Sequence, residues 1–281
     1  MNAPTIFQTS SYLGAYARSF GRGKTFHRLT VPGGRIWLQS RGRSARRLEC
    51  WGAGLHDLGA AWTEDESAAP PLFAAVRELA GRHDGAVLSQ IAADSPLLGP
   101  ALAAGWKSTP AETCPVLELP STYEAYVKSL GKNMRDQIKR YPKRLEKEFQ
   151  VEYELARTPA QVDAALADLF RLHGKRWRAR GQTGVLGLPS RQRFHRAVCH
   201  GLLKRDALRL WTLRCNGAPA CVLLNYVHRN VYYFFIGGFE PELMRWSVGT
   251  CLFARVFETA ISEGATSFDF LRGEEEYKYR Y

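Results

Sequence analysis

The residue types best suited to chemistry gather in the C-terminal part of the chain. They are two carboxylates, a phenol and two cations: Glu240, Asp269, Tyr277, Arg272 and Lys278. A carboxylate can relay a proton, a phenol can donate one, and a cation can stabilise developing negative charge. Such a set would serve a transfer reaction in which an amine loses a proton and a leaving group gains one.

Asp269 lies in the apolar run SFDFL at the same parity as Leu271, which predicts that its side chain points inward. An unpaired carboxylate there would have a raised pKa. From sequence alone, a salt bridge to Arg272 or Lys278 that fixes the tail carries more weight. For Tyr277 and Lys278 the alternative is an ordinary position on a terminal strand. The run DFLRG beside an apolar strand favours a site.

A loop that opens a helix lies between these carboxylates. The backbone N–H groups at a helix start have no partner within the helix, and the helix dipole there favours negative charge. Gly249 would let a phosphate approach the backbone closely, so a pyrophosphate is the expected guest. The alternative is an ordinary capped helix in which Gly249 is needed for packing. The predicted donor-binding residues are Arg245, Ser247, Val248, Gly249 and Thr250.

His173 and Trp177 form a candidate pair upstream. They are four residues apart and share one face of a helix predicted over 159–180. They could line an acceptor pocket, with His173 as general base, although a histidine beside a tryptophan is more often a packed core residue. Cys251 lacks a histidine at a known range, and we expect a small core residue. No Cys or His spacing suits zinc, so we expect no metal.

The chain is strongly basic, with 39 Lys and Arg against 27 Asp and Glu and a formal net charge of +12. This favours an anionic partner such as a CoA phosphate, a nucleic acid, a lipid surface or a phosphorylated sugar. Within 128–147, cations recur at helical spacing, and Pro142 should kink the helix. The stripe contains Lys132, Arg135, Lys139 and Lys143. It is either a solvated helix face or a clamp on an anionic donor, a tRNA or membrane headgroups.

Length and composition predict two lobes. With 281 residues and 45% hydrophobic content, the chain can bury one large core or two modest ones. Residues 1–120 alternate short apolar runs with two helical stretches, which predicts an α/β lobe. Its strands should begin at Phe26, Arg35, Arg46, Ala86 and Pro115, and its helices at Leu72 and Ser95. No apolar run reaches the length needed to span a bilayer and no leader is visible, so we expect a cytoplasmic protein.

A basic linking helix over 121–148 and a second α/β lobe over 149–281 should follow. Helices at 159–180 and 189–204 precede a hairpin, in which Asn216-Gly217 favours a type I′ turn. Arg229-Asn230 should make the next turn of a three-stranded antiparallel meander. A helix over 248–262 and a strand from Ser267 complete the lobe. The expected class is α/β in the α+β sense, with mixed, mostly antiparallel sheets flanked by helices.

Taken in order, these motifs resemble one acyltransferase family. The segments WSVGTCL (246–252) and DFLRGEEEYK (269–278) resemble the C-terminal lobe of the BioF2-like family of the GNAT superfamily, which is related to the CelD-type proteins of cellulose biosynthesis. LHGKRWRARGQTG (172–184) and the basic helix (130–148) resemble its upstream elements. The match covers 123–281. Residues 1–120 loosely resemble the degenerate first lobe of FemAB-like members, which implies tandem GNAT-like lobes.

The resemblance implies N-acyl transfer from acyl-CoA to an amine. The thioester would bind between two splayed strands, with its pyrophosphate near Gly249 and Thr250, and the reaction would rest mainly on positioning. Trp177, Arg272 and Glu240 would then contact the substrate. The loop carries only half of the superfamily's Q/R-x-x-G-x-G/A pattern. The CelD-type resemblance points towards polysaccharide or cell-envelope biosynthesis.

Two alternatives stay open. FemAB-like aminoacyl transfer from a charged tRNA fits the basic surface, although no extended coiled-coil arm is visible. A non-catalytic accessory module that binds an anionic partner is the other. A dedicated nucleic-acid protein comes last, because only Tyr141 is interleaved with the basic stripe.

Overall fold

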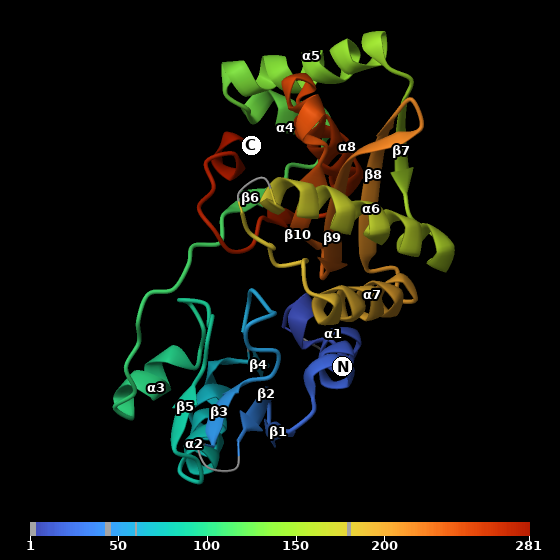
Figure 1. Ribbon diagram of the computed structural model, residues 1–281. Helices are drawn as coiled ribbons and strands as arrows, with labels where there is room; N and C mark the ends of the chain where they lie inside the picture. Colours follow the sequence, from blue (N-terminus) through green and yellow to red (C-terminus); the bar gives the residue numbers. More distant parts are fainter. Residues whose placement is uncertain (1–3, 43–45, 60, 179–180) are drawn as a thin grey trace. The chain divides into compact units, whose positions relative to one another are not determined.

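The computed structural model describes residues 4–42, 46–59, 61–178 and 181–281 (Figure 1). The chain forms two compact units, Met1–Glu112 and Thr113–Tyr281. Each unit has its own sheet and its own hydrophobic core. Of the helices in the described ranges, none is long and apolar enough to cross a membrane.

The first unit is built on a five-stranded sheet in the order β1-β2-β3-β5, with β4 pairing to β2. The strands are β1 (Lys24–Val31), β2 (Gly34–Arg41), β3 (Arg47–Cys50), β4 (Trp62–Thr63) and β5 (Gly85–Val87). Among the described strands of this sheet, β3 and β5 are the one parallel pair. Helix α2 (Ala69–Ala80) buries Leu72, Phe73 and Val76 against Ile36 and Leu38 of the sheet.

The remaining elements of this unit include two that the sequence pattern did not predict. These are α1 (Ser10–Phe20), which follows the short 3-10 helix η1 (Ile6–Gln8) and is capped by the Thr9 hydroxyl, and the two-residue strand β4. A second 3-10 turn, η2 (Glu66–Ala68), precedes α2. Helix α3 (Leu98–Ala103) begins three residues after the expected Ser95 start and has no side-chain cap.

The second unit contains a six-stranded sheet in the order β6-β11-β10-β9-β8-β7. Its strands are β6 (Val116–Glu118), β7 (Val151–Leu155), β8 (Leu208–Cys215), β9 (Ala218–His228), β10 (Val231–Phe239) and β11 (Ser267–Asp269). We expected the strand from Pro115 in the first lobe, and that assignment was wrong. It pairs antiparallel with β11, because short apolar strands do not reveal their partners in the sequence.

Both predicted turns of the meander are confirmed. Asn216 and Gly217 have φ of 51° and 76°, and Arg229 and Asn230 have φ of 53° and 60°. Positive φ at both central residues is what a type I′ turn requires, and its twist matches that of the paired strands. The turns fix β8, β9 and β10 as consecutive antiparallel neighbours.

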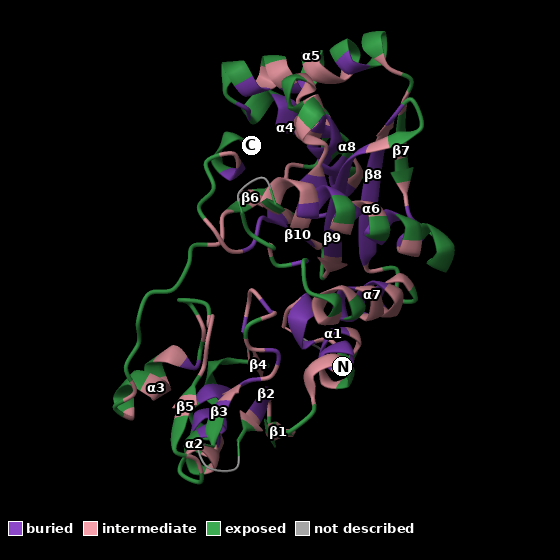
Figure 2. Cartoon of the chain, in the orientation of Figure 1, coloured by how far each residue is buried: buried purple, intermediate pink, exposed green. Residues whose placement is uncertain are grey.

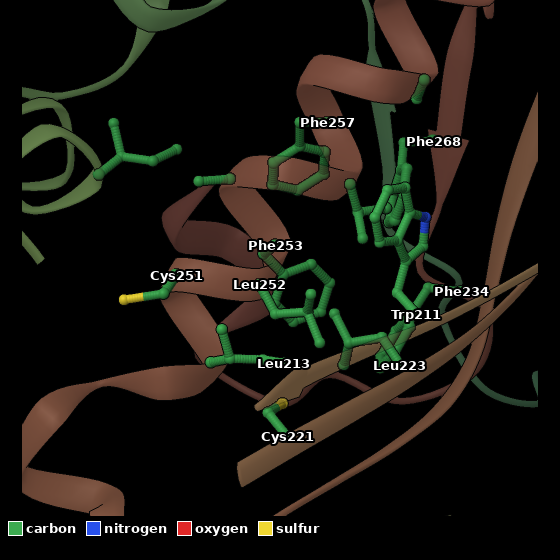
Figure 3. Packing of buried hydrophobic residues seen from close by; sticks show 14 of the residues in the cluster. Trp211, Leu213, Cys221, Leu223, Phe234, Cys251, Leu252, Phe253, Phe257 and Phe268 are labelled. Carbon is green, nitrogen blue, oxygen red and sulfur yellow. The ribbon is translucent and has the colours of Figure 1, made fainter. Parts of the chain in front are cut away.

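Helices cover both faces of this sheet. Helices α6 (Pro159–Arg178) and α7 (Pro189–Leu203) pack on one face, and α8 (Val248–Ser262) packs on the other, with α4 (Tyr123–Ser129) and α5 (Lys132–Glu148) against α8 (Figure 1). Burial is densest along β8, β9 and β10 (Figure 2). Aromatic rings of α8 meet strand residues in the core, where Phe253 and Phe234 lie 5.0 Å apart between ring centroids (Figure 3).

The basic segment differs from the single kinked helix that we expected. It forms α4 and α5, which are separate helices, and Pro142 lies inside the 17-residue α5. The apolar side chains Met134, Ile138 and Leu145 hold α5 to the core, so one missing backbone donor does not end it.

Candidate acyl-transfer site

The parallel pairing between β10 and β11 is short. It runs from Val231–Ser267 to Tyr233–Asp269, whereas β10 continues to Phe239 with β9 alone as its partner. Within the described residues, no strand pairs with the β11-facing edge of β10 beyond Tyr233. Backbone N–H and C=O groups on that edge are therefore available to a ligand.

Local irregularities shape this free part of β10. The ladder with β9 shifts register between Phe234 and Ile236, which bends the strand. Gly238 then lies directly beneath α6, where a Cβ would fall 2.8 Å from the backbone nitrogen of His173. Glycine is thus required for α6 to approach β10 beyond Tyr233. We call this place, where β10 and β11 have separated, the opening.

The start of α8 lies at the same end of the sheet as the opening, because β10 leads into it through the 3-10 helix η3 (Pro241–Trp246). Ser247 has left-handed backbone (φ 54°) and gives the helix no side-chain cap. A Cβ on Gly249 would meet nothing within 4 Å. The expected alternative, a glycine demanded by packing, is therefore wrong, and the space before the first turn of α8 is open.

Basic and aromatic side chains flank this helix start. The guanidinium groups of Arg144 and Arg245 lie 4.6 Å and 5.2 Å from the Trp246 ring centroid. The Thr250 side chain lies near the Tyr281 phenol, where it opposes the rise in the Tyr281 pKa that burial causes. The positive charges and the helix dipole favour an anion at this end of α8.

The predicted pair on α6 is in contact. The Trp177 indole N–H donates to His173 Nε2 at 2.8 Å, and His173 Nδ1 is buried with no hydrogen-bond partner in the described residues. Burial and the Arg176 charge lower the pKa of His173 to about 4. The lone pair that a general base needs is already bound to Trp177, so the geometry favours a neutral, structural imidazole.

Asp269 and Lys278 shape the chain after β11. Asp269 is buried, and its Oδ1 accepts the Leu271 backbone N–H at 2.7 Å, which supports the left-handed backbone of Leu271 (φ 55°). Lys278 is also buried, and its Nζ donates to the carbonyls of Leu271, Arg272 and Gly273. It also pairs with Glu275 at 2.9 Å. The Lys278 ammonium is therefore used within the loop.

Tyr277 and Glu275 lie on the tail beyond this loop. Burial, followed by the Glu275 charge, raises the pKa of Tyr277, so its phenol stays protonated and can donate. Burial raises the pKa of Glu275, but the hydrogen bond and charge of Lys278 and the charge of Arg176 outweigh it, and the pKa ends below its usual value. Tyr277 is the better proton donor of the two.

Glu240 ties the end of β10 to α6. Its carboxylate binds Lys175 at 2.7 Å and Arg171 at 3.4 Å. Burial raises its pKa, but the neighbouring Glu242 and the hydrogen bond and charge of Lys175 leave it lowered. Glu240 therefore stays ionised and positions η3, which leads to the start of α8.

The matching family model, an acetyltransferase (GNAT) domain, aligns with residues 132–279 of the chain. That alignment spans more than half of the 281 residues. The chain belongs to the GNAT acetyltransferase-domain family. The expected superfamily is thereby confirmed. No curated protein sequence matched the chain.

Solved structures share the fold at low sequence identity. The crystal structure of FemX has a TM-score of 0.67 at 11% identity, covering 97% of this chain and 84% of that one. L-PGS from Bacillus licheniformis has a TM-score of 0.59 at 13% identity, covering 92% and 74%. The C-terminal domain assigned to a lysylphosphatidylglycerol synthetase from Agrobacterium fabrum has a TM-score of 0.59 at 15%, covering 95% and 75%. These likenesses confirm the mixed α/β fold class.

Within this GNAT fold, the structure brings most of the predicted residues to one end of the sheet. The opening is bordered by the C-terminal end of α6, the free edge of β10, the loop after β11 and the start of α8. Arg272 is half-buried in that loop. Cys251 is buried, and burial with nearby Cys215 raises its thiol pKa to about 12, which argues against a nucleophile.

Sequence reasoning missed three residues that the GNAT fold places at the opening. Arg176 lies inside the quoted 172–184 motif, and Glu275 inside 269–278, so both were visible without an assigned role. Arg144 lies in the basic segment, where its type and spacing do not distinguish it from the other cations. In the parts of the chain that the structure describes, no three His, Cys, Asp or Glu side chains gather to hold a metal.

Proposed function

We propose that the chain is an N-acyltransferase that moves an acyl group from acyl-CoA to an amine, in polysaccharide or cell-envelope biosynthesis. The observation that carries this proposal is the end of the β10–β11 ladder at Tyr233–Asp269, beside the uncapped start of α8. An extended thioester fits an unpaired strand edge, and its phosphates fit the helix start.

The residues at the opening support a direct transfer. The amine nitrogen attacks the thioester carbonyl, the C–N bond forms and the C–S bond breaks. Free N–H groups of β10 beyond Tyr233 can donate to the carbonyl oxygen as it becomes negative. Asp269 would take up the proton that the amine loses, and Tyr277 would give a proton to the departing thiolate. His173 and Lys278 would hold the site in shape and would not transfer protons.

The residues before α8 fit a CoA pyrophosphate. Gly249 leaves the first turn open, and Arg245 and Arg144 supply charge beside Trp246. Arg245, Ser247, Val248, Gly249 and Thr250 remain the proposed donor-binding residues. Thr250 would contribute its backbone N–H at the helix start.

A second candidate is aminoacyl transfer from a charged tRNA, as in the FemAB-type resemblance. The outer face of α5 favours it, because six exposed cations lie there and form no salt bridge within the described chain. They are Lys132, Lys139, Arg140, Lys143, Arg144 and Lys147. Helix α5 packs on α8 through its opposite, apolar face, and Arg144 at the edge of the cationic face lies beside Trp246 before α8. An accessory module that only binds an anionic surface is the third candidate.

Ligand-dependent melting separates the three candidates. A ligand that binds only the folded state raises the melting temperature, so the protein is titrated with CoA, acetyl-CoA, longer acyl-CoAs and bulk tRNA. Saturable stabilisation by an acyl-CoA, with thiol release when amines are added, is expected. Stabilisation by tRNA alone would select the second candidate. No shift with any of them would select the accessory module.

A further inference from the structure

Arg176 is a half-buried cation at the C-terminal end of α6 with no carboxylate partner. Its guanidinium carbon lies 5.7 Å from the ring centroid of Phe239, the last residue of β10. It forms no ion pair with any residue of the described ranges. By contrast, Arg171 and Lys175 on the same helix both bind Glu240. Arg176 thus holds an unneutralised charge at the opening.

Arg176 lies where α6 reaches the end of β10, which Phe239 forms. Helix α6 covers the face of the sheet opposite to α8, whose start is the proposed phosphate site. Gly238, the neighbour of Phe239, packs against α6 at His173, so this end of α6 lies along the free part of β10. An amine that attacks from the α6 face would pass Arg176.

The charge of Arg176 extends across this opening to the tail. It contributes to the lowered pKa of Glu275 and opposes the rise in the pKa of Tyr277 that burial causes. Arg176 therefore lies near the residue that would protonate the leaving thiolate, without forming a salt bridge to Glu275.

A guanidinium group is planar and always charged, and its paired N–H donors match the two oxygens of a carboxylate or phosphate. Partial burial weakens its hydration, so a bound anion would compensate it, whereas a neutral ligand would not. We propose that Arg176 binds an oxyanion, a carboxylate or a phosphate, that is part of the amine acceptor. This inference rests on the proposed acyl transfer.

The test compares amines that differ only in the anion. Glycine is paired with glycinamide, and phosphoethanolamine with ethanolamine, and each is measured by calorimetric binding and by thiol release from acetyl-CoA. The variants are Arg176→Met, which keeps the aliphatic stem, and Arg176→Lys, which keeps the charge. Arg178→Met is the matched control, because that exposed arginine lies over Gly174 on the same helix.

A charge-assisted bidentate contact predicts that Arg176→Met weakens binding of the preferred anionic amine by about 10- to 100-fold, with less loss in Arg176→Lys. In the Arg176 variants, the KM for acetyl-CoA and the affinity for the neutral amines should change little. Arg178→Met should behave like wild type. The better of glycine and phosphoethanolamine identifies the anion.

The inference would be overturned if wild-type protein binds neither anionic amine, or binds each anionic amine no better than its neutral partner. Thiol release with any amine would still uphold the proposed transferase. If binding depends on Arg176 but no amine releases thiol, the subsite stands and the proposed function fails. Arg176→Met must also melt like wild type. If it does not, amine binding by Arg176→Lys is compared with wild type instead, because lysine keeps the aliphatic stem and the charge but loses the paired N–H donors of the guanidinium.

Discussion

Tyr233 and Asp269 form the last pair of the parallel ladder between β10 and β11. Their neighbours along each strand, Phe234 and Phe268, point into the core beneath α8, so both side chains face the α6 side of the sheet. The strands separate immediately after this pair. A carboxylate and a phenol therefore border the place where the sheet opens.

Asp269→Asn should separate the two roles of this carboxylate. Asparagine can still accept the Leu271 N–H, so the turn is kept while the charge is lost. We expect turnover to fall by about 100-fold or more, as for loss of a general base, with an unchanged acyl-CoA KM. Melting should shift by less than about 4 °C, which corresponds to roughly 1 kcal/mol. An Asn variant with wild-type turnover would restrict Asp269 to supporting the turn.

Lys278→Met should lower the stability of the fold, because Lys278 serves the loop and not the reaction. The buried ammonium satisfies three backbone carbonyls and pairs with Glu275, and methionine can replace none of these bonds. Leaving those groups unpaired predicts a loss of about 2–3 kcal/mol in the free energy of unfolding, measured in urea. The control Lys147→Met, on the exposed face of α5, should change stability by less than about 0.5 kcal/mol. Full stability with lost turnover in Lys278→Met would instead give Lys278 a direct role.

Most of the second unit could be predicted because its signals are local. The type I′ turns, the apolar strands between them and the helix after Ser247 are each specified within a few residues. The partner of β6 depends on residues about 150 positions away, Ser267 to Asp269, and no local pattern encodes that pairing. Helix α1 begins directly after Thr9, whose hydroxyl caps it, so its start carries a local signal in the sequence.

The candidate site was predictable in residue types but not in contacts. The sequence pointed to Asp269, Tyr277 and Lys278, yet whether a side chain faces substrate or its own loop depends on the backbone. Lys278 turns back to the carbonyls of its loop, and His173 is bound by Trp177. The role proposed for Arg176 could not be predicted, because one arginine among the cations at the end of α6 carries no signal until its surroundings are known.

Gly249→Val should remove donor binding and leave the fold unchanged. A Cβ at this position meets nothing within 4 Å, so the added side chain occupies only the space before α8. We expect affinity for CoA to fall at least about 10-fold, through lost approach of the phosphates to the backbone. Melting should stay within about 2–4 °C of wild type.

Gly99→Val is the matched control for that variant, because Gly99 also lies in the first turn of a helix, α3, with nothing near its would-be Cβ. It should retain CoA affinity. Unchanged CoA binding in Gly249→Val would remove the phosphates from the start of α8, whatever the control shows.

His173 should make stability depend on pH below neutrality. Burial and the Arg176 charge lower its folded pKa to about 4, against about 6.5 in the unfolded chain. Between those pH values His173 binds a proton in the unfolded state but not in the folded state. The contribution of neutral His173 to the free energy of unfolding is therefore complete above pH 6.5 and is lost as pH falls towards 4. Urea unfolding at pH 7, 5.5 and 4.5 should therefore show a decline that His173→Gln reduces.

The same pKa predicts what His173 does not do in catalysis. With its pKa near 4 and its Nε2 bound to Trp177, the imidazole stays neutral across the working range and cannot supply an ionisation near pH 6.5. The pH profile of kcat/KM should keep its shape in His173→Gln, even if its amplitude drops through altered packing. A limb near pH 6.5 that disappears in His173→Gln would restore His173 as the general base and displace Asp269 from that role.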